Sequence, residues 1–225
     1  MSAAVPVSEM GMVITMQESS AAPRGSLPEL CTFGGIALAD MIRRRKVSAE
    51  EVMATYLDHI GRTNPAVNAI ISLRPRDELL AEAREADDAV ARGKVLGPLH
   101  GVPQAIKDLA LTRGLLTTFG SHLFADFVPD EDAIIVERMR AAGALIIGKT
   151  NVPEYGYGSN SYNPLFGLTR NAYDPSKVGG GSRAAARAWR WPCGCCQSPM
   201  AATWAVPSAI RRRSTTCSAS APRRA

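Results

Sequence analysis

The sequence predicts an α/β fold, because helical and strand-like apolar patterns alternate along residues 28–182. Apolar residues make up 46% of the 225-residue chain, which is enough to build a core at a length typical of one domain or two small ones. Residues 1–27 are rich in Ser, Ala, Met and Pro without a sustained period, so we expect a loose leader there.

Two helices are predicted first. Apolar residues recur at helical spacing from Gly34 onward, and Ser48 with Glu51 forms a capping box that begins a second helix. We expect Asn64-Pro65 to end this second helix.

The rest of residues 28–182 continues the alternation of strands and helices. The predicted elements are, in order, a strand over 67–73, a helix over 78–91, a strand over 101–108, a helix over 132–142 and a strand over 144–147. Residues 148–182 are rich in Gly, Asn, Ser and Tyr, and a loop of that length in a compact domain is usually functional.

Residues 183–225 have a composition unlike the rest of the chain. They contain eight Arg and no Lys, Asp or Glu, whereas residues 1–182 carry 18 basic against 21 acidic side chains and sum to −3. The formal net charge of +5 therefore comes from the tail. All three Trp and four of the five Cys also lie after residue 182. Because the tail has no periodic apolar face, we predict that it is a disordered basic segment.

Several classes of protein and site are disfavoured. No run approaches the eighteen apolar residues of a membrane span and no secretory signal is present, so we expect a cytoplasmic protein without membrane association. Cys31, outside the tail, is expected to be a small buried hydrophobe. Cys193-Gly194-Cys195-Cys196 lacks a His or a second CxxC pair, so no metal site is expected. Arg211-Arg212-Arg213 lies among Trp residues, but we expect no nucleic-acid partner.

Two features outside the tail could carry chemistry. Lys107 ends an apolar strand; it either reaches solvent from the strand end or is desolvated, so that its neutral amine can act as a general base. Gly179-Gly180-Gly181-Ser182 is either a flexible linker or a tight turn that presents backbone amides and a hydroxyl. Each feature alone leaves both alternatives open.

Together with their surroundings, these features resemble the amidase signature family, serine hydrolases that cleave C–N bonds of amides. The resemblance is carried, in the family's order and spacing, by GPLHGVPQAIKD at 97–108, DAIIVERMRAAGALIIGKTNVPEYGYGSN at 132–160 and NPLFGLTRNAYDPSKVGGGS at 163–182. It runs from about Pro28 to Ser182. It implies that residues 28–182 are the N-terminal portion of a mixed β-sheet sandwiched between α-helices.

The resemblance also implies a Ser-Ser-Lys triad. Lys107 matches the family's catalytic lysine and Ser182 its bridging serine, although Ser182 is either of two adjacent serines in the family's turn. Gly179, Gly180 and Gly181 would supply the backbone amides that bind the oxyanion. The substrate would be a small-molecule amide, and no metal or organic cofactor enters. The family needs no histidine as a base, so three histidines are expected to be structural or exposed: His59, His100 and His122.

The chain departs from the family at the nucleophile. A Gly-Gly-Ser segment should follow Ser182 by a little over twenty residues, but Trp204-Ala205-Val206-Pro207 stands there instead. If each tail residue is decoded from the third base of one codon and the first two of the next, the alternatives in a GC-rich gene include Gly-Gly-Ser near Val206. We therefore predict that residues 183–225 are a frameshift product, with the slip close to Ser182-Arg183, and that the chain as written is inactive.

Two other functions remain open. One is a non-catalytic binding protein that uses the basic tail to contact a partner. The other is the glutaminase (A) subunit of a tRNA-dependent amidotransferase, which shares the Lys107 and Ser182 motifs. The stretch Pro153-Glu154-Tyr155-Gly156 resembles stand-alone amidases more than that glutaminase.

Overall fold

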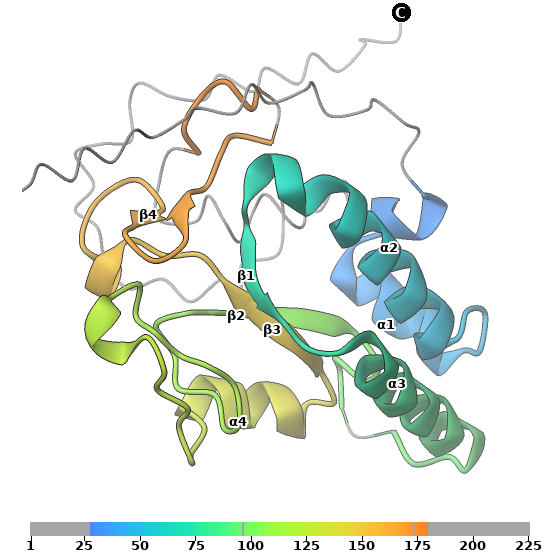
Figure 1. Ribbon diagram of the computed structural model, residues 1–225. Helices are drawn as coiled ribbons and strands as arrows, with labels where there is room; N and C mark the ends of the chain where they lie inside the picture. Colours follow the sequence, from blue (N-terminus) through green and yellow to red (C-terminus); the bar gives the residue numbers. More distant parts are fainter. Residues whose placement is uncertain (1–27, 96, 173, 180–225) are drawn as a thin grey trace, which may run out of the picture.

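The computed structural model of the protein describes residues 28–95, 97–172 and 174–179 (Figure 1). The α-helices are α1 (Gly35–Arg43), α2 (Ala49–Val67), α3 (Arg76–Ala91) and α4 (Ile134–Ala141), and short 3₁₀ turns lie at Glu29–Thr32, His122–Phe124 and Glu154–Gly156. The strands are β1 (Ile70–Leu73), β2 (Pro103–Lys107), β3 (Leu145–Thr150), β4 (Tyr162–Asn163) and β5 (Gly167–Leu168). The predicted leader and the predicted tail at 183–225 lie outside the described residues and stay predictions.

A mixed three-stranded sheet forms the centre of the fold, in the order β1-β3-β2. β3 pairs with β2 in parallel and with β1 antiparallel, and α4 lies in the connection from β2 to β3. Helices α1 to α3 lie on one side of this sheet and α4 lies on the other (Figure 1). The predicted α/β class, with a mixed sheet between helices, is confirmed.

Two apolar cores hold these layers together. The larger core joins α1, α2 and α3 to the sheet and includes Leu38, Met53, Leu79 and Ile147, each almost completely buried. The smaller core lies on the α4 side and consists of Ile106, Val136, Ala144 and Ile146. Cys31 is 1% exposed in the larger core, as predicted for a small buried hydrophobe.

Helix α2 extends beyond its predicted end at Asn64-Pro65. It continues to Val67 and stops at Asn68, whose φ of 52° places it in the left-handed region. Pro65 lies in the last turn, where its missing N–H removes one helical hydrogen bond close to the natural end of the helix. The Asn64 side chain accepts hydrogen bonds from the backbone of Ala69 and Ile70, at 2.9 and 2.8 Å, so it joins the helix end to β1.

The start of α2 was predicted correctly but is fixed partly by a residue far along the chain. Ser48 Oγ accepts a hydrogen bond from the Glu51 amide at 2.9 Å, as a helix cap should. The Asp87 carboxylate of α3 accepts from the amides of Ala49 and Glu50, at 2.7 and 3.1 Å. Helix α2 is therefore tied to α3 at its first turn.

Strand β3 continues three residues beyond the predicted end at Ile147, because Gly148 forms a bulge rather than a strand end. In the pairing with β2, Ile146 lies opposite Gln104 and Gly148 opposite Ala105, so Ile147 is an extra residue on β3. A Cβ on Gly148 would overlap the Ser72 carbonyl oxygen of β1. Only glycine permits this close approach of the two strands.

The bulge determines which way the end of β3 faces. Ile147 and Gly148 both lie toward the larger core, since Gly148 is opposite Ala105, which packs against that core. Alternation then resumes, which directs Lys149 to the α4 side with Ile106 and Thr150 to the opposite side with Lys107. Without the extra residue, Lys149 would face the larger core and Thr150 would face the α4 side.

We predict that Gly148→Ala lowers the free energy of unfolding by roughly 3 kcal/mol, because the strands must separate to admit the methyl group. Urea unfolding measures this change. Gly61→Ala is the matched control, since a Cβ at Gly61 in α2 would meet nothing within 4 Å. The control should be neutral or more stable, as is usual for Gly→Ala within a helix. A Gly148→Ala protein as stable as wild type would show that the bulge does not require glycine.

Candidate active site

Lys107 is the last residue of β2 and lies beside Thr150 of β3 in the parallel register. Ile106 packs into the smaller core, whereas Ala105 packs against the larger one. Because side chains alternate along a strand, Lys107 shares the face of Ala105, toward the α1 to α3 layer. Its side chain is half-buried. The predicted position of Lys107 at a strand end is therefore confirmed.

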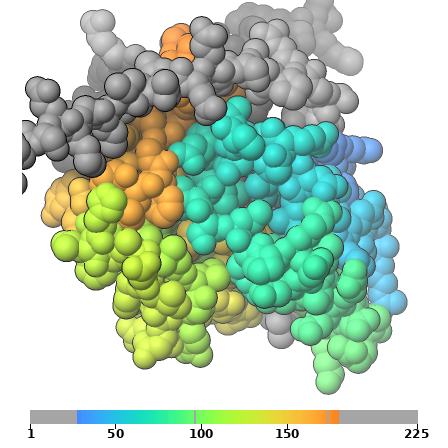
Figure 2. Space-filling view, in the orientation of Figure 1, coloured from blue at the N-terminus to red at the C-terminus, as the bar shows by residue number. Residues whose placement is uncertain are grey.

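Gly179 is joined to the same end of the sheet by a short chain of hydrogen bonds. Its N–H donates to the Thr169 carbonyl at 3.0 Å. Thr169 Oγ1 accepts from Asn151 Nδ2 at 3.0 Å and donates to the Asn68 carbonyl at 2.7 Å. Asn151 directly follows Thr150, the neighbour of Lys107. Figure 2 shows the segment after β5, in orange, lying against the end of α2, in teal.

The structure thus holds Lys107 and the first glycine of the predicted turn at one end of β3. Gly179 itself is buried. Gly180, Gly181 and Ser182 lie outside the described residues, as does Val206, where the nucleophile was expected. The roles assigned to these residues stay predictions.

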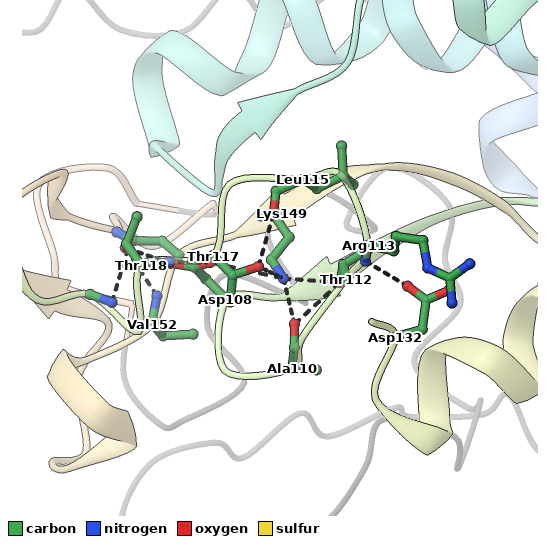
Figure 3. Close-up of polar contacts among 12 residues, drawn as sticks. Asp108, Ala110, Thr112, Arg113, Leu115, Thr117, Thr118, Asp132, Lys149 and Val152 are labelled. Carbon is green, nitrogen blue, oxygen red and sulfur yellow. Dashed lines mark hydrogen bonds and ion pairs between the residues drawn. The ribbon is translucent and has the colours of Figure 1, made fainter. Parts of the chain in front are cut away.

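A second lysine, which the sequence analysis did not single out, lies on the α4 side of the sheet (Figure 3). Lys149 is completely buried. Its Nζ donates to the Ala110 carbonyl at 2.6 Å and to the hydroxyls of Thr112 and Thr117 at 3.0 Å each. These three acceptors match the three donors of an ammonium group. Lys149 therefore ties β3 to the segment that follows β2.

Asp108 directly follows Lys107 and completes this buried cluster. Its Oδ1 lies 4.0 Å from Lys149 Nζ, and its Oδ2 accepts from the Thr118 hydroxyl at 2.6 Å. The Thr118 amide also donates to the carboxylate, at 3.1 Å. The sequence did not reveal this cluster, because the predicted strand stopped at Ile147 and left Lys149 in a loop. A signal was nevertheless present, since Lys149 follows an apolar run as Lys107 does.

Burial dominates the electrostatics of this pair. Desolvation lowers the pKa of Lys149 to about 8, and the negative charges of Asp108 and Asp132 offset only part of that effect. Desolvation also raises the pKa of Asp108, against the opposing effects of the Thr118 hydrogen bonds and the Lys149 charge. The mutual attraction of the two groups therefore does not fully compensate for their removal from water.

A strained tyrosine connects the loop after β3 to the same cluster. Tyr155 has a φ of 50°, which is rare for a bulky residue. Its amide donates to the Phe119 carbonyl at 2.7 Å and its hydroxyl donates to Ser121 Oγ at 3.0 Å. The Gly120 amide between them donates to Thr118 Oγ1 at 3.0 Å. The segment held by Asp108 thus fixes the backbone of the Tyr155 loop as well.

An open depression of about 470 Å³ lies beside the described end of the glycine turn. It is lined by Pro153, Tyr157, Gly158, Ser159, Asn160, Tyr162, Leu168 and Val178. Val178 immediately precedes Gly179, so a molecule in this depression would lie next to the predicted turn. Its lining combines two tyrosine rings with polar side chains.

Other kinds of site find little support in the described ranges. No group of His, Cys, Asp and Glu there could hold a metal ion. No helix in that part of the chain is long and apolar enough to cross a membrane. His59 and His100 are buried, with His100 Nε2 lying 2.9 Å from the Ala86 carbonyl, and His122 is exposed. These positions suit the structural and surface roles expected of the histidines.

Replacing Lys149 by Met should destabilise the protein by about 3 kcal/mol at pH 7, because the buried carboxylate and three acceptors lose their donor. The pKa of about 8 in the folded protein lies below the ordinary 10.5. The unfolded chain therefore binds more protons between these values, and Lys149 makes wild type more stable as pH rises through that window. The difference in unfolding free energy between wild type and Lys149→Met should grow from about pH 8 to pH 10.

Urea unfolding at a series of pH values measures this difference. Lys46→Met is the matched control because Lys46 is exposed, and its difference from wild type should stay flat. A flat profile for Lys149→Met as well would contradict the lowered pKa.

Comparison with known proteins places the chain in a family. The family model described as Amidase matches residues 51–185. The A subunit of the glutamyl-tRNA(Gln) amidotransferase of Acidothermus cellulolyticus is 44% identical over 156 residues, which are 69% of this chain and 31% of that protein.

Solved structures give the same result. A bacterial aryl acylamidase of the amidase signature family is 27% identical with a TM-score of 0.65, over 70% of this chain and 33% of its own. The peptide amidase of Stenotrophomonas maltophilia is 31% identical with a TM-score of 0.63, over 69% of this chain and 33% of its own. The chain therefore spans about a third of the length of these relatives. Because the matched residues include β2 with Lys107 and the chain up to Gly179, this protein belongs to the amidase signature family of amide-hydrolysing enzymes.

Proposed function

We propose that residues 28–182 are the N-terminal portion of a hydrolase that cleaves amide C–N bonds through an acyl-enzyme. The observation that carries this proposal is the common attachment of Lys107 and Gly179 to the end of β3. Lys107 lies there through its register with Thr150, and Gly179 through Thr169 and Asn151. A base and a glycine turn held by the same strand end are what a Ser-Ser-Lys centre requires.

The proposed proton path begins at Lys107 in its neutral form. As the nucleophilic serine attacks the amide carbonyl, it gives its proton to Ser182 Oγ, and Ser182 passes its own proton to Lys107 Nζ. Backbone amides of Gly180 and Gly181 bind the resulting oxyanion, whereas the Gly179 amide, expected to share this role, donates to the Thr169 carbonyl. The relay then runs in reverse, so that the amine leaves protonated as the C–N bond breaks. Water hydrolyses the acyl-enzyme by the same route.

We propose further that this chain lacks its nucleophile because of a frameshift close to Ser182-Arg183. The family match ends at residue 185, where the composition also changes. Val206 and Pro207 offer no hydroxyl, and Pro207 has no backbone N–H either. The chain as written is therefore inactive, and restoring the downstream frame restores turnover.

The proposed substrate is a small-molecule amide, and the depression beside Gly179 is the proposed place for its acyl part. The proposed compartment is the cytoplasm, which is supported by Cys31 being the single cysteine of residues 1–182. A binding protein that uses the basic tail is a weaker proposal, because it requires the tail to be in the native frame.

A glutaminase component of an amidotransferase is the second candidate, and the names of several relatives favour it. The relatives from Acidothermus cellulolyticus and Azoarcus sp., which are 44% and 46% identical, are both named as the A subunit of glutamyl-tRNA(Gln) amidotransferase. If this protein works in that way, its substrate is the side-chain amide of glutamine and it needs a partner protein. Ammonia release from glutamine, compared with hydrolysis of aryl amides by the frame-restored protein, separates the two candidates.

Lys107→Ala in the frame-restored protein should lower kcat/KM by roughly three orders of magnitude or more, because no base then accepts the serine proton. Steady-state hydrolysis of an aryl amide measures this loss. Lys94→Ala is the matched control, since Lys94 is exposed and lies outside the site, and it should behave as wild type. Near-normal kcat in Lys107→Ala would end the assignment of Lys107 as the base.

A serine-directed fluorophosphonate probe should label the frame-restored protein at one serine and leave the 225-residue chain unlabelled. The reason is that only the restored frame contains an activated serine. Mass spectrometry of the labelled peptide locates the serine, which should lie at the position of Val206 or next to it. Stoichiometric labelling of the uncorrected chain at a single serine would refute the frameshift.

A further inference from the structure

The hydroxyl of Thr150 is buried without a hydrogen-bond partner in the part of the chain that the structure describes. The residue is 1% exposed. Leaving a hydroxyl unpaired inside a protein is unfavourable, so such a group calls for a structural or functional explanation. Two other buried polar atoms there share this property, His59 Nε2 and Ser161 Oγ, but neither residue belongs to the sheet.

The sheet register shows what lies next to this hydroxyl. Thr150 is on the central strand, opposite Ile70 of β1 on one side and Lys107 of β2 on the other. Side chains in register on adjacent strands share a face, so these three lie in one row. Ile70 has no polar side-chain atom. Lys107 is therefore the residue in this row that can exchange a hydrogen bond with Thr150.

We propose that the Thr150 hydroxyl is a positioning group for the amine of Lys107. This inference rests on the proposed function of Lys107 as the base. It assigns Thr150 a role in holding the amine at the strand end as the proton arrives and leaves.

A hydroxyl suits this role because it is both donor and acceptor and can rotate between the two. It donates to the lone pair of a neutral amine and accepts from an ammonium, so it holds Lys107 in both protonation states. A carboxylate at the same place would favour the ammonium alone and would hinder its return to the neutral base. The Asp108 carboxylate bonds instead to Thr118, on the other side of the sheet beside Lys149.

Thr150→Val separates this role from a structural one, because valine has the shape of threonine without the hydroxyl. The amine of Lys107 is half-buried and can bond to water when the hydroxyl is removed, so the variant should unfold at about the same urea concentration as wild type. Thr117→Val is the contrasting control. Its hydroxyl accepts from Lys149 and donates to the Leu115 carbonyl at 3.1 Å, so this variant should lose stability.

Activity should nevertheless fall in the frame-restored protein. We expect Thr150→Val to lower kcat about tenfold with KM within about twofold of wild type, the pattern of an interaction needed during proton transfer rather than in binding. Thr150→Ser keeps the hydroxyl and should retain most of kcat. Wild-type kcat in Thr150→Val, or a loss of stability like that of Thr117→Val, would overturn the inference.

A second readout uses the 225-residue chain and does not depend on catalysis. The sequence has five lysines, so ¹³C-labelled lysine should give five resolvable Cε signals, and Lys46, Lys94 and Lys177 are exposed references. The Lys107 signal should move in Thr150→Val and return in Thr150→Ser, while the reference signals stay in place. An unmoved Lys107 signal would overturn the inference. Failure of the proposed function would appear separately, as activity retained in Lys107→Ala.

Discussion

The close approach of β1 to β3 at Gly148 is the constraint on which the candidate site depends. Because Gly148 has no Cβ, the Ser72 carbonyl can lie against it and Ile147 can be the extra residue of a bulge. The bulge reverses the facing of the next two side chains. As a result, Lys149 ties the strand to its surroundings on one face, and Thr150 lies on the opposite face beside Lys107, the proposed base.

The two lysines at this end of the sheet differ in their surroundings. Lys149 is saturated by three acceptors inside the α4 layer, where it joins β3 to the chain after β2. Lys107 is half-buried on the other face, near the hydrogen bonds that hold Gly179. Asp108 lies between them in sequence and bonds to the side of Lys149. Lys107, the proposed base, must be neutral to accept a proton, and in this arrangement the Asp108 carboxylate bonds on the opposite side of the sheet.

The features that could be predicted from the sequence are those that depend on residues close together in the chain. The helices, the strand that ends at Lys107 and the cap at Ser48 follow from periodicity and capping chemistry, and the family resemblance is carried by the segments at 97–108, 132–160 and 163–182. The features that the sequence did not predict depend on contacts between residues far apart in the chain. Asp87 caps α2 from α3, Asn64 carries α2 past Pro65, and Ser72 makes Gly148 a bulge rather than a strand end. Lys149 was missed for the last of these reasons, since a strand that stops at Ile147 places it in a loop.

Sequencing the gene across codons 175–225 tests most directly whether Lys107 belongs to a serine-hydrolase centre whose nucleophile lies in another reading frame. We expect a one-base change close to codon 182 to open a frame that encodes two glycines followed by serine, with the serine at or next to the position of Val206. A gene in which neither alternative frame encodes such a serine there would contradict the assignment.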